Sequence, residues 1–357
     1  MEGTHSGARA SVRYVAVNSL NTLIVTLNIL DSRTGKIRIS IWNVKANKVA
    51  QKFDRDIPAE LYPVPRFSPC GQFLGIPLRP CKPSQTSVVE LINCTGEKPT
   101  VIETVTISVT LISIALTHNC KRLAVSENQQ VSAPGSARIH TEPRTALHID
   151  HVYGRNVNYM DGERYVLAIV DSMGSHVIVK WEISSGAVVQ YLNFGQSKYL
   201  SPMLEMSPLS PHLVVIRHSE NSSQPRLPVR VYSLENPEEG ATVGKAEEGA
   251  RDREIPVTEW DFVASEVSKD GLIFVRNGIL CHLKWDSMLV KQQARIDRSA
   301  GKGTDVLALV HSELENQLTL VFEDGHIGVG KLREPSPLSS RRTLGHLVNG
   351  IRNLTGS

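Results

Sequence analysis

The sequence contains no long hydrophobic run and no strong excess of one charge. Its longest apolar stretches, such as Thr22 to Leu30, are too short to cross a bilayer, so we expect no membrane segment. The 357 residues carry a formal net charge of +3 and no lysine or arginine block, which argues against a nucleic-acid partner. The first residues, Met1 to Ser11, lack the apolar core of a signal peptide, so secretion is not expected.

Cysteine is scarce, and its spacing fits neither a disulfide framework nor a zinc site. The number is odd, and no two cysteines form a C-x-x-C pair. This usage is typical of reduced thiols, so we expect a cytoplasmic or nuclear protein. The five residues are Cys70, Cys81, Cys94, Cys120 and Cys281.

The familiar catalytic motifs are also missing. We find no G-x-S-x-G elbow, no H-E-x-x-H helix, no P-loop and no G-x-G-x-x-G turn. Gly301-Lys302-Gly303-Thr304 resembles only the end of a P-loop, because the upstream glycine is absent and no helix is expected to follow. We therefore assign no catalytic residue, no cofactor and no metal site, and we lean against an enzyme.

What the chain does contain is a repeated strand pattern. Runs of four to seven alternating residues are separated by Gly, Pro, Asn, Asp and Ser turns, which is typical of a many-stranded antiparallel protein. Four runs end on an aromatic residue followed by a small or acidic polar one, at about 45–50 residues or a multiple of it, which is the period of a propeller blade. These runs are Ile37–Asn43, His176–Glu182, Val229–Ser233 and Ile279–Asp286.

The pattern predicts an all-β fold, a β-propeller of four-stranded antiparallel blades. Seven blades fit best, and a shifted boundary would give six or eight. They begin near Arg13, Val64, Ile112, Val157, Leu204, Val257 and Val306. The clearest turn lies in the second blade, where Pro69 fixes a turn dihedral and Gly71 supplies a left-handed position.

The domain organisation follows from the blades. Residues 1–12 form a flexible N-terminus, 13–334 a single propeller and 335–357 a tail. Within the tail, Arg341–Leu347 either supplies the outer strand of the last blade or binds a partner as a peptide. The charged stretch Glu235–Glu254 is interpreted as a mobile connection between the fifth and sixth blades.

These marks resemble the WD-repeat family over about Arg13 to Leu332. The resemblance rests on Phe67-Ser68-Pro69-Cys70-Gly71, Trp42-Asn43, Trp181-Glu182 and Trp285-Asp286. The Gly-His pair that usually opens a repeat is missing and Trp-Asp occurs once, so the chain resembles a divergent member of no recognised subfamily. The resemblance implies a platform for other proteins, which is an argument from fold alone.

Local clusters give weak candidates for chemistry. His148-Ile149-Asp150-His151 combines metal-ligand and general-base residue types, but one strand supplies two convergent ligands at most, so polar residues at a blade edge are the simpler interpretation. Asp324-Gly325-His326 and Gly345-His346 are typical turn sequences. Trp42, Trp181 and Trp285 are expected to pack between blades, whereas Trp260 either packs or lines the central channel.

Loop lengths point to one face of the disc. The second and third strands of four blades are joined by long loops that emerge together, and insertions gathered on one face are typical of a binding face. These loops are Asn28–Lys36, Arg79–Thr86, Glu127–Ser136 and Ser219–Pro228.

The sequence therefore predicts a non-catalytic scaffold or adaptor that binds other proteins through the loop face. The alternative is an enzyme or small-molecule binder, of hydrolase, lyase, isomerase or cyclase type, with a pocket at the central channel. A third interpretation is a detached relative of the sensor propeller of a nucleotide-switch protein. It is weaker, because no nucleotide-binding segment is present.

Overall fold

The computed structural model describes the strands and their nearest connections, and the account below is confined to those residues. They are 12–20, 22–31, 36–44, 46, 48–56, 64–78, 86–108, 111–127, 139–144, 146–160, 163–172, 175–193, 203–206, 212–216, 226–233, 250–256, 265–268, 270–276, 278–287, 289–296, 306–312, 317–322, 326–331 and 352–353. Predicted features at 301–304, Trp260, 341–347 and most of the long loops lie outside them.

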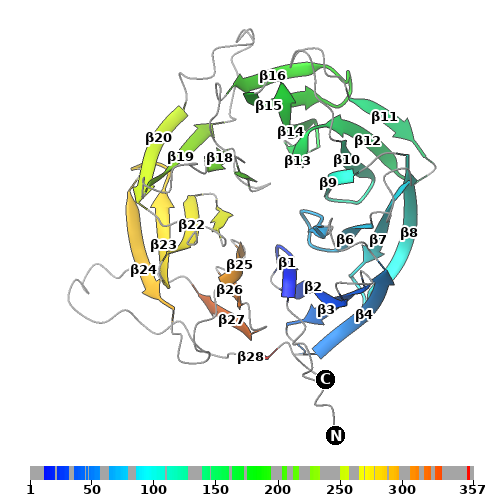
Figure 1. Cartoon of the computed structure of the whole chain (residues 1–357), viewed down its shortest axis with the longest axis horizontal. Helices are drawn as coiled ribbons and strands as arrows, with labels where there is room; N and C mark the ends of the chain where they lie inside the picture. The colour runs from blue at the N-terminus through cyan, green and yellow to red at the C-terminus, as the bar shows by residue number, and fades with distance from the viewer. Residues whose placement is uncertain are drawn as a thin grey trace, which may run out of the picture.

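The described strands pair into seven four-stranded sheets that stand around a central axis (Figure 1). We number these sheets as blades 1 to 7 in chain order. The all-β propeller that the sequence predicts is confirmed.

Each blade takes four consecutive strands. The first four blades contain β1 (Val12–Val17), β2 (Leu23–Asp31), β3 (Lys36–Asn43), β4 (Lys48–Asp56); β5 (Arg66–Phe67), β6 (Phe73–Leu78), β7 (Ser87–Asn93), β8 (Thr100–Ile107); β9 (Leu111–Leu116), β10 (Arg122–Glu127), β11 (His140–Pro143), β12 (His148–Tyr153); and β13 (Arg155–Met160), β14 (Tyr165–Ser172), β15 (Ser175–Glu182), β16 (Val188–Asn193). The last three contain β17 (Met203–Met206), β18 (His212–Ile216), β19 (Arg226–Ser233), β20 (Ala250–Pro256); β21 (Ser265–Val267), β22 (Gly271–Arg276), β23 (Ile279–Lys284), β24 (Val290–Arg295); and β25 (Val306–Ser312), β26 (Gln317–Phe322), β27 (His326–Lys331), β28 (Arg352–Asn353).

Six of these sheets are simple antiparallel meanders, and blade 3 is not. Its spatial order is β9-β10-β12-β11, and β10 and β12 run parallel. The expectation of seven antiparallel blades is therefore wrong for this blade. The exchange has a physical reason, because Pro143 in β11 lacks an N–H group and suits an edge strand. The apolar residues Ile149 and Val152 of β12 are buried in the interior position instead.

One outer strand differs from the expectation. The fourth strand of blade 5 is Ala250–Pro256, which overlaps the stretch Glu235–Glu254 that the composition predicts to be a connection. Charged residues are ordinary on an outer strand, so composition alone is misleading here. In blade 7, Arg352–Asn353 pairs with β27, a pairing of two residues that leaves almost no sequence signal, whereas the candidate strand Arg341–Leu347 lies outside the described residues.

A buried polar residue ends the first strand of several blades and shapes the turn that follows. Asn18 accepts hydrogen bonds from Thr22 N and Leu23 N through Oδ1, at 2.8 and 2.9 Å. Ser68, Thr117 and Ser268 accept in the same way from the backbone that opens the second strand, and all of them are buried. The predicted left-handed glycine, Gly71, has φ of 71° and is confirmed.

The aromatic marks are in register in three blades but not in the fourth. Trp42, Trp181 and Tyr232 each pair with the second residue of the preceding strand. In blade 6 that position is Leu283, and Trp285 lies two residues further on. The prediction that the four runs end alike is therefore wrong for Trp285, whose indole Nε1 donates instead to the Ser268 carbonyl oxygen at 3.1 Å.

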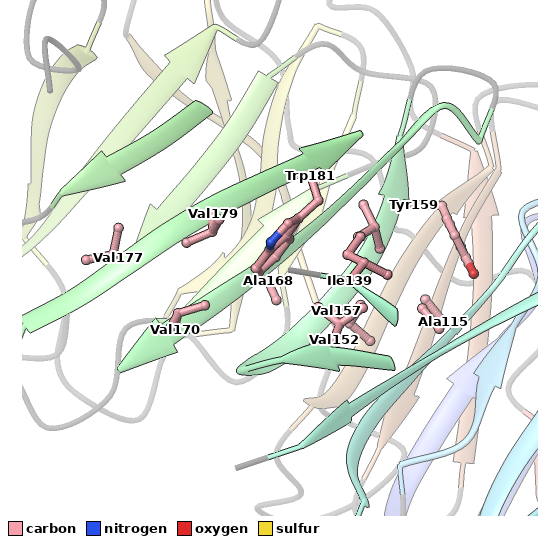
Figure 2. Close-up of a cluster of buried hydrophobic side chains, with 12 residues drawn as sticks. Ala115, Ile139, Val152, Val157, Tyr159, Ala168, Val170, Val177, Val179 and Trp181 are labelled. Atoms are coloured by element: carbon pink, nitrogen blue, oxygen red, sulfur yellow. The ribbon is translucent and has the colours of Figure 1, made fainter. Parts of the chain in front are cut away.

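The core lies between the blades. The cluster between blades 3 and 4 includes Val157, Tyr159 and Trp181, and the Trp181 side chain is fully buried (Figure 2). The seam between the last blade and the first is apolar as well, with Ile24 and Val321 buried against Trp42. The packing between blades predicted for Trp42 and Trp181 agrees with these positions, and Trp285 is buried as well.

Candidate functional site

The sequence candidate with the richest chemistry, His148 to His151, lies on β12 in blade 3. Its residues do not converge. His148 is exposed, Ile149 is in the core, Asp150 is completely buried and His151 is partly exposed. The strand alternation therefore separates the carboxylate from the imidazole of His151.

Asp150 is the centre of a buried hydrogen-bond network. Arg122 donates to both carboxylate oxygens, from Nη2 to Oδ1 at 2.6 Å and from Nε to Oδ2 at 2.9 Å. Thr141 Oγ1 donates to Oδ1 at 2.7 Å, and Tyr159 Oη donates to Oδ2 at 2.7 Å. Thus β10, β11, β12 and β13 meet at one carboxylate, and the network joins blade 3 to blade 4.

This network favours structure over chemistry. Each carboxylate oxygen of Asp150 already accepts two hydrogen bonds. A carboxylate in that state has little capacity left to bind a metal ion or to accept a proton from a substrate. Burial, followed by the charge of Asp150, raises the pKa of the Tyr159 hydroxyl well above its usual value, so this group stays a neutral donor. The network therefore holds two blades together and is not a catalytic centre.

His140 on the edge strand β11 and His151 on the interior strand β12 form a looser group. His151 Nε2 lies 3.5 Å from Glu142 Oε2, and the rings of His140 and His151 are 5.9 Å apart. Across all the described residues, no group of three or more His, Cys, Asp or Glu side chains is placed to hold a metal ion. The interpretation of His148–His151 as polar residues at a blade edge is therefore wrong, because β12 lies between β11 and β10 and both Ile149 and Asp150 are buried.

A second arrangement, missed in the sequence, links the turns after the first strands of blades 1 to 4. Ser19 Oγ donates to the Pro69 carbonyl oxygen at 2.9 Å. Cys70 Sγ donates to the His118 carbonyl oxygen at 2.8 Å, and the His118 N–H donates to Glu163 Oε1 at 2.6 Å. We call this series the turn rim. The sequence does show turn residues that repeat at the blade period. It does not show that the turns of neighbouring blades contact one another.

The cysteines in the described part of the chain are free thiols. Burial raises the pKa of Cys94 to about 12 and that of Cys120 to about 11. Since the thiolate is the reactive form, neither residue is suited to be a nucleophile.

A third feature is apolar and exposed. Val101 and Ile102 on β8, the outer strand of blade 2, are 41% and 51% exposed. They are the only adjacent pair of exposed large apolar side chains among the residues whose burial is described. The sequence pattern alone does not indicate this pair, because a regular strand would turn one of two neighbouring side chains toward the core.

Comparison with known proteins gives the fold and little more. No family model matches the chain, and no curated protein matches it. Among solved structures, similarity extends over nearly the whole chain: Kuenenia stuttgartiensis hydrazine synthase has a TM-score of 0.58 at 12% identity, covering 93% of this chain and 98% of the other.

Two further structures are β-propellers of the WD40 type. The β-propeller domain of Myceliophteria thermophila Cps50 (Swd1) has a TM-score of 0.52 at 11% identity, covering 89% and 95% of the two chains. A chain of the mitotic checkpoint complex has a TM-score of 0.52 at 12% identity, covering 90% of each. At these identities the likeness establishes the fold alone, which is a β-propeller.

No helix among the described residues has the length and apolar character needed to cross a bilayer.

Proposed function

We propose that this protein is a non-catalytic interaction scaffold or adaptor that binds other proteins through a face of its propeller. The observation that carries the proposal is the state of Asp150. It is the only buried carboxylate among the residues whose side-chain burial is described, and its hydrogen-bonding capacity is used to join two blades. The buried network therefore has a structural role, and we infer that the function of the protein resides at its surface.

The comparisons support the same class of function. One similar structure belongs to the mitotic checkpoint complex, which is an assembly of proteins. The alternative of a channel enzyme has no supporting constellation among the described residues, where no metal-binding cluster is found. We keep the loop face, the cytoplasmic or nuclear location and the single propeller domain as parts of the proposal.

The test is crosslinked affinity purification of the tagged chain from its own cells, with partners identified by mass spectrometry. We expect a stoichiometric protein partner that is lost when the loop within Glu127–Ser136 or Ser219–Pro228 is shortened. A matched control replaces Glu97 and Lys98, two exposed residues between β7 and β8, with alanine. Recovery of the chain as a monomer without a partner would contradict the scaffold function.

A further inference from the structure

The outer strand of blade 2 is an unusual edge. β8 pairs with β7 on one side only, and seven of its eight residues are β-branched. Its single charged residue is Glu103, which forms no ion pair within the described part of the structure. A long edge strand of strong β propensity and low charge is a template for pairing with another chain.

The other long outer strands carry the devices that prevent such pairing. Charged residues are frequent along β4, β20 and β24, and a proline lies at the end of β11. The uncharged β16 exposes one large apolar side chain, Val189, at 38%. Natural sheets use charged residues and proline to prevent their edge strands from pairing with other chains. Both are scarce on β8, which favours an edge that pairs with a partner.

A bulge explains why two neighbouring apolar side chains are exposed on β8. The register shifts between Leu91 and Ile92, so that Val101 lies opposite Ile92 and Glu103 opposite Leu91. Ile102 is the additional residue. Regular alternation would turn one of two neighbours toward the core, whereas the bulge leaves both Val101 and Ile102 at the surface.

The backbone of this edge is available for pairing. The Thr106 carbonyl oxygen accepts a hydrogen bond from Arg144 Nη2 at 3.0 Å, so it points away from β7. Because the direction of backbone groups alternates along an antiparallel strand, the carbonyl of Thr104 points to the same outer side. Arg144 therefore marks one end of the open edge, which extends back to Thr100.

We propose that an extended segment of a partner protein adds to β8 as a fifth strand of blade 2. Its backbone would pair with the outer side of Thr100–Thr104, and its apolar side chains would cover Val101 and Ile102. A lysine or arginine on the segment would face Glu103, the unpaired charge on the strand. This inference rests on the proposed scaffold function and names one partner chemistry for it.

The occupant is a different protein rather than a second copy of this chain. Two copies of the open edge Thr100–Thr104, paired antiparallel about Ile102, would bring the two Glu103 side chains to diagonal positions on one face, and like charges there are unfavourable. A partner strand that carries a lysine or arginine has the charge opposite to that of Glu103, so this repulsion does not arise.

The test uses a capped, fluorescein-labelled peptide of sequence Val-Thr-Val-Lys-Val-Thr. We expect saturable binding by fluorescence anisotropy, together with slower amide hydrogen exchange in residues 100–106. Methylating alternate backbone nitrogens of the peptide should weaken binding at least tenfold, because it removes the hydrogen bonds of a paired strand. Replacing the peptide lysine with glutamate should weaken it as well, and the variant Glu103→Lys should reverse that preference.

Two lysine variants test whether the peptide binds at β8. Ile102→Lys should weaken the peptide at least tenfold, whereas Val189→Lys, on the outer strand of blade 4, should leave binding unchanged. Both side chains are exposed, and circular dichroism verifies that each variant folds. Equal effects of the two variants, or tight binding of the methylated peptide, would overturn the proposal. A dimer of the wild-type chain that Ile102→Lys dissociates in sedimentation would overturn it too.

The two proposals fail separately. A partner captured alike by the wild-type chain and Ile102→Lys, with no peptide binding, would remove the β8 site and retain the scaffold. Peptide binding at β8 without any partner from cells would retain the site and contradict the scaffold function.

Discussion

Replacing Asp150 with alanine should destabilise this protein far more than the removal of a similar surface carboxylate. The change deletes the acceptor of four hydrogen bonds and leaves the Tyr159 hydroxyl buried without a partner. The Arg122 side chain, only 22% exposed, loses its counter-charge. Removing one member of a buried ion pair costs about 3 to 5 kcal/mol, and that is the loss of unfolding free energy that we expect.

The chain provides a matched control in Asp54→Ala. Arg38 binds Asp54 with the same two-point geometry, at 2.8 and 3.0 Å, but the two side chains are 38% and 41% exposed. An exposed pair contributes about 0.2 to 1 kcal/mol, so this variant should be close to the wild type. Because the arginine geometry is equal, the difference between the two variants reports burial together with the two further hydrogen bonds that Asp150 accepts from Thr141 and Tyr159.

The assay is urea unfolding followed by circular dichroism, with the free energy taken from the midpoint and slope. A second arm combines Tyr159→Phe with Asp150→Ala. We expect the double variant to lose less than the sum of the single losses, since both changes break the same hydrogen bond. If Asp150→Ala and Asp54→Ala cost the same, the network does not join blades 3 and 4 in the way that we describe.

Three further results are expected. Gly154→Ala, between β12 and β13, should lower the unfolding free energy by about 2 kcal/mol or more, because φ is +113° and the new Cβ would press against the Ile169 carbonyl oxygen; an unchanged urea midpoint would contradict this. Burial and, secondarily, Lys284 lower the pKa of His282, so stability that is present at neutral pH should fall as pH drops through the unfolded value of about 6.5. His282→Gln should flatten that slope by up to about 1.4 kcal/mol per pH unit, and an unaltered slope would exclude His282 as its source. Finally, the raised pKa of Cys94 predicts that iodoacetamide at pH 8 labels it only after unfolding, which peptide mass spectrometry would show, and rapid labelling of the native protein would refute it.

Much of the architecture can be predicted from the sequence because each blade repeats the same kinds of strand and turn residues. The buried turn residues Ser68 and Thr117, and the left-handed Gly71, act within a few residues of themselves. Such short-range signals survive divergence. For this reason blade boundaries could be placed although no family model matches.

What failed were contacts that depend on distant parts of the chain. Nothing local indicates that β12 would pair in parallel with β10, since both orders give a four-stranded sheet. The shift of Trp285 depends on which residue of β23 faces Leu272. Likewise, the sequence offered His148, Asp150 and His151 together, but the partners that decide the role of Asp150 are on β10, β11 and β13.

The closure of the ring has a mechanical consequence. Among the described strands, the first and last blades share none, and their seam is the side-chain packing around Ile24 and Val321. The final strand, β28, is attached to β27 by the pairing of two residues. Force applied to the two chain ends would therefore detach β28 first and then separate the apolar seam. Blades 1 and 7 would then separate without the loss of backbone hydrogen bonds between them, because the described strands of the two blades do not pair with each other.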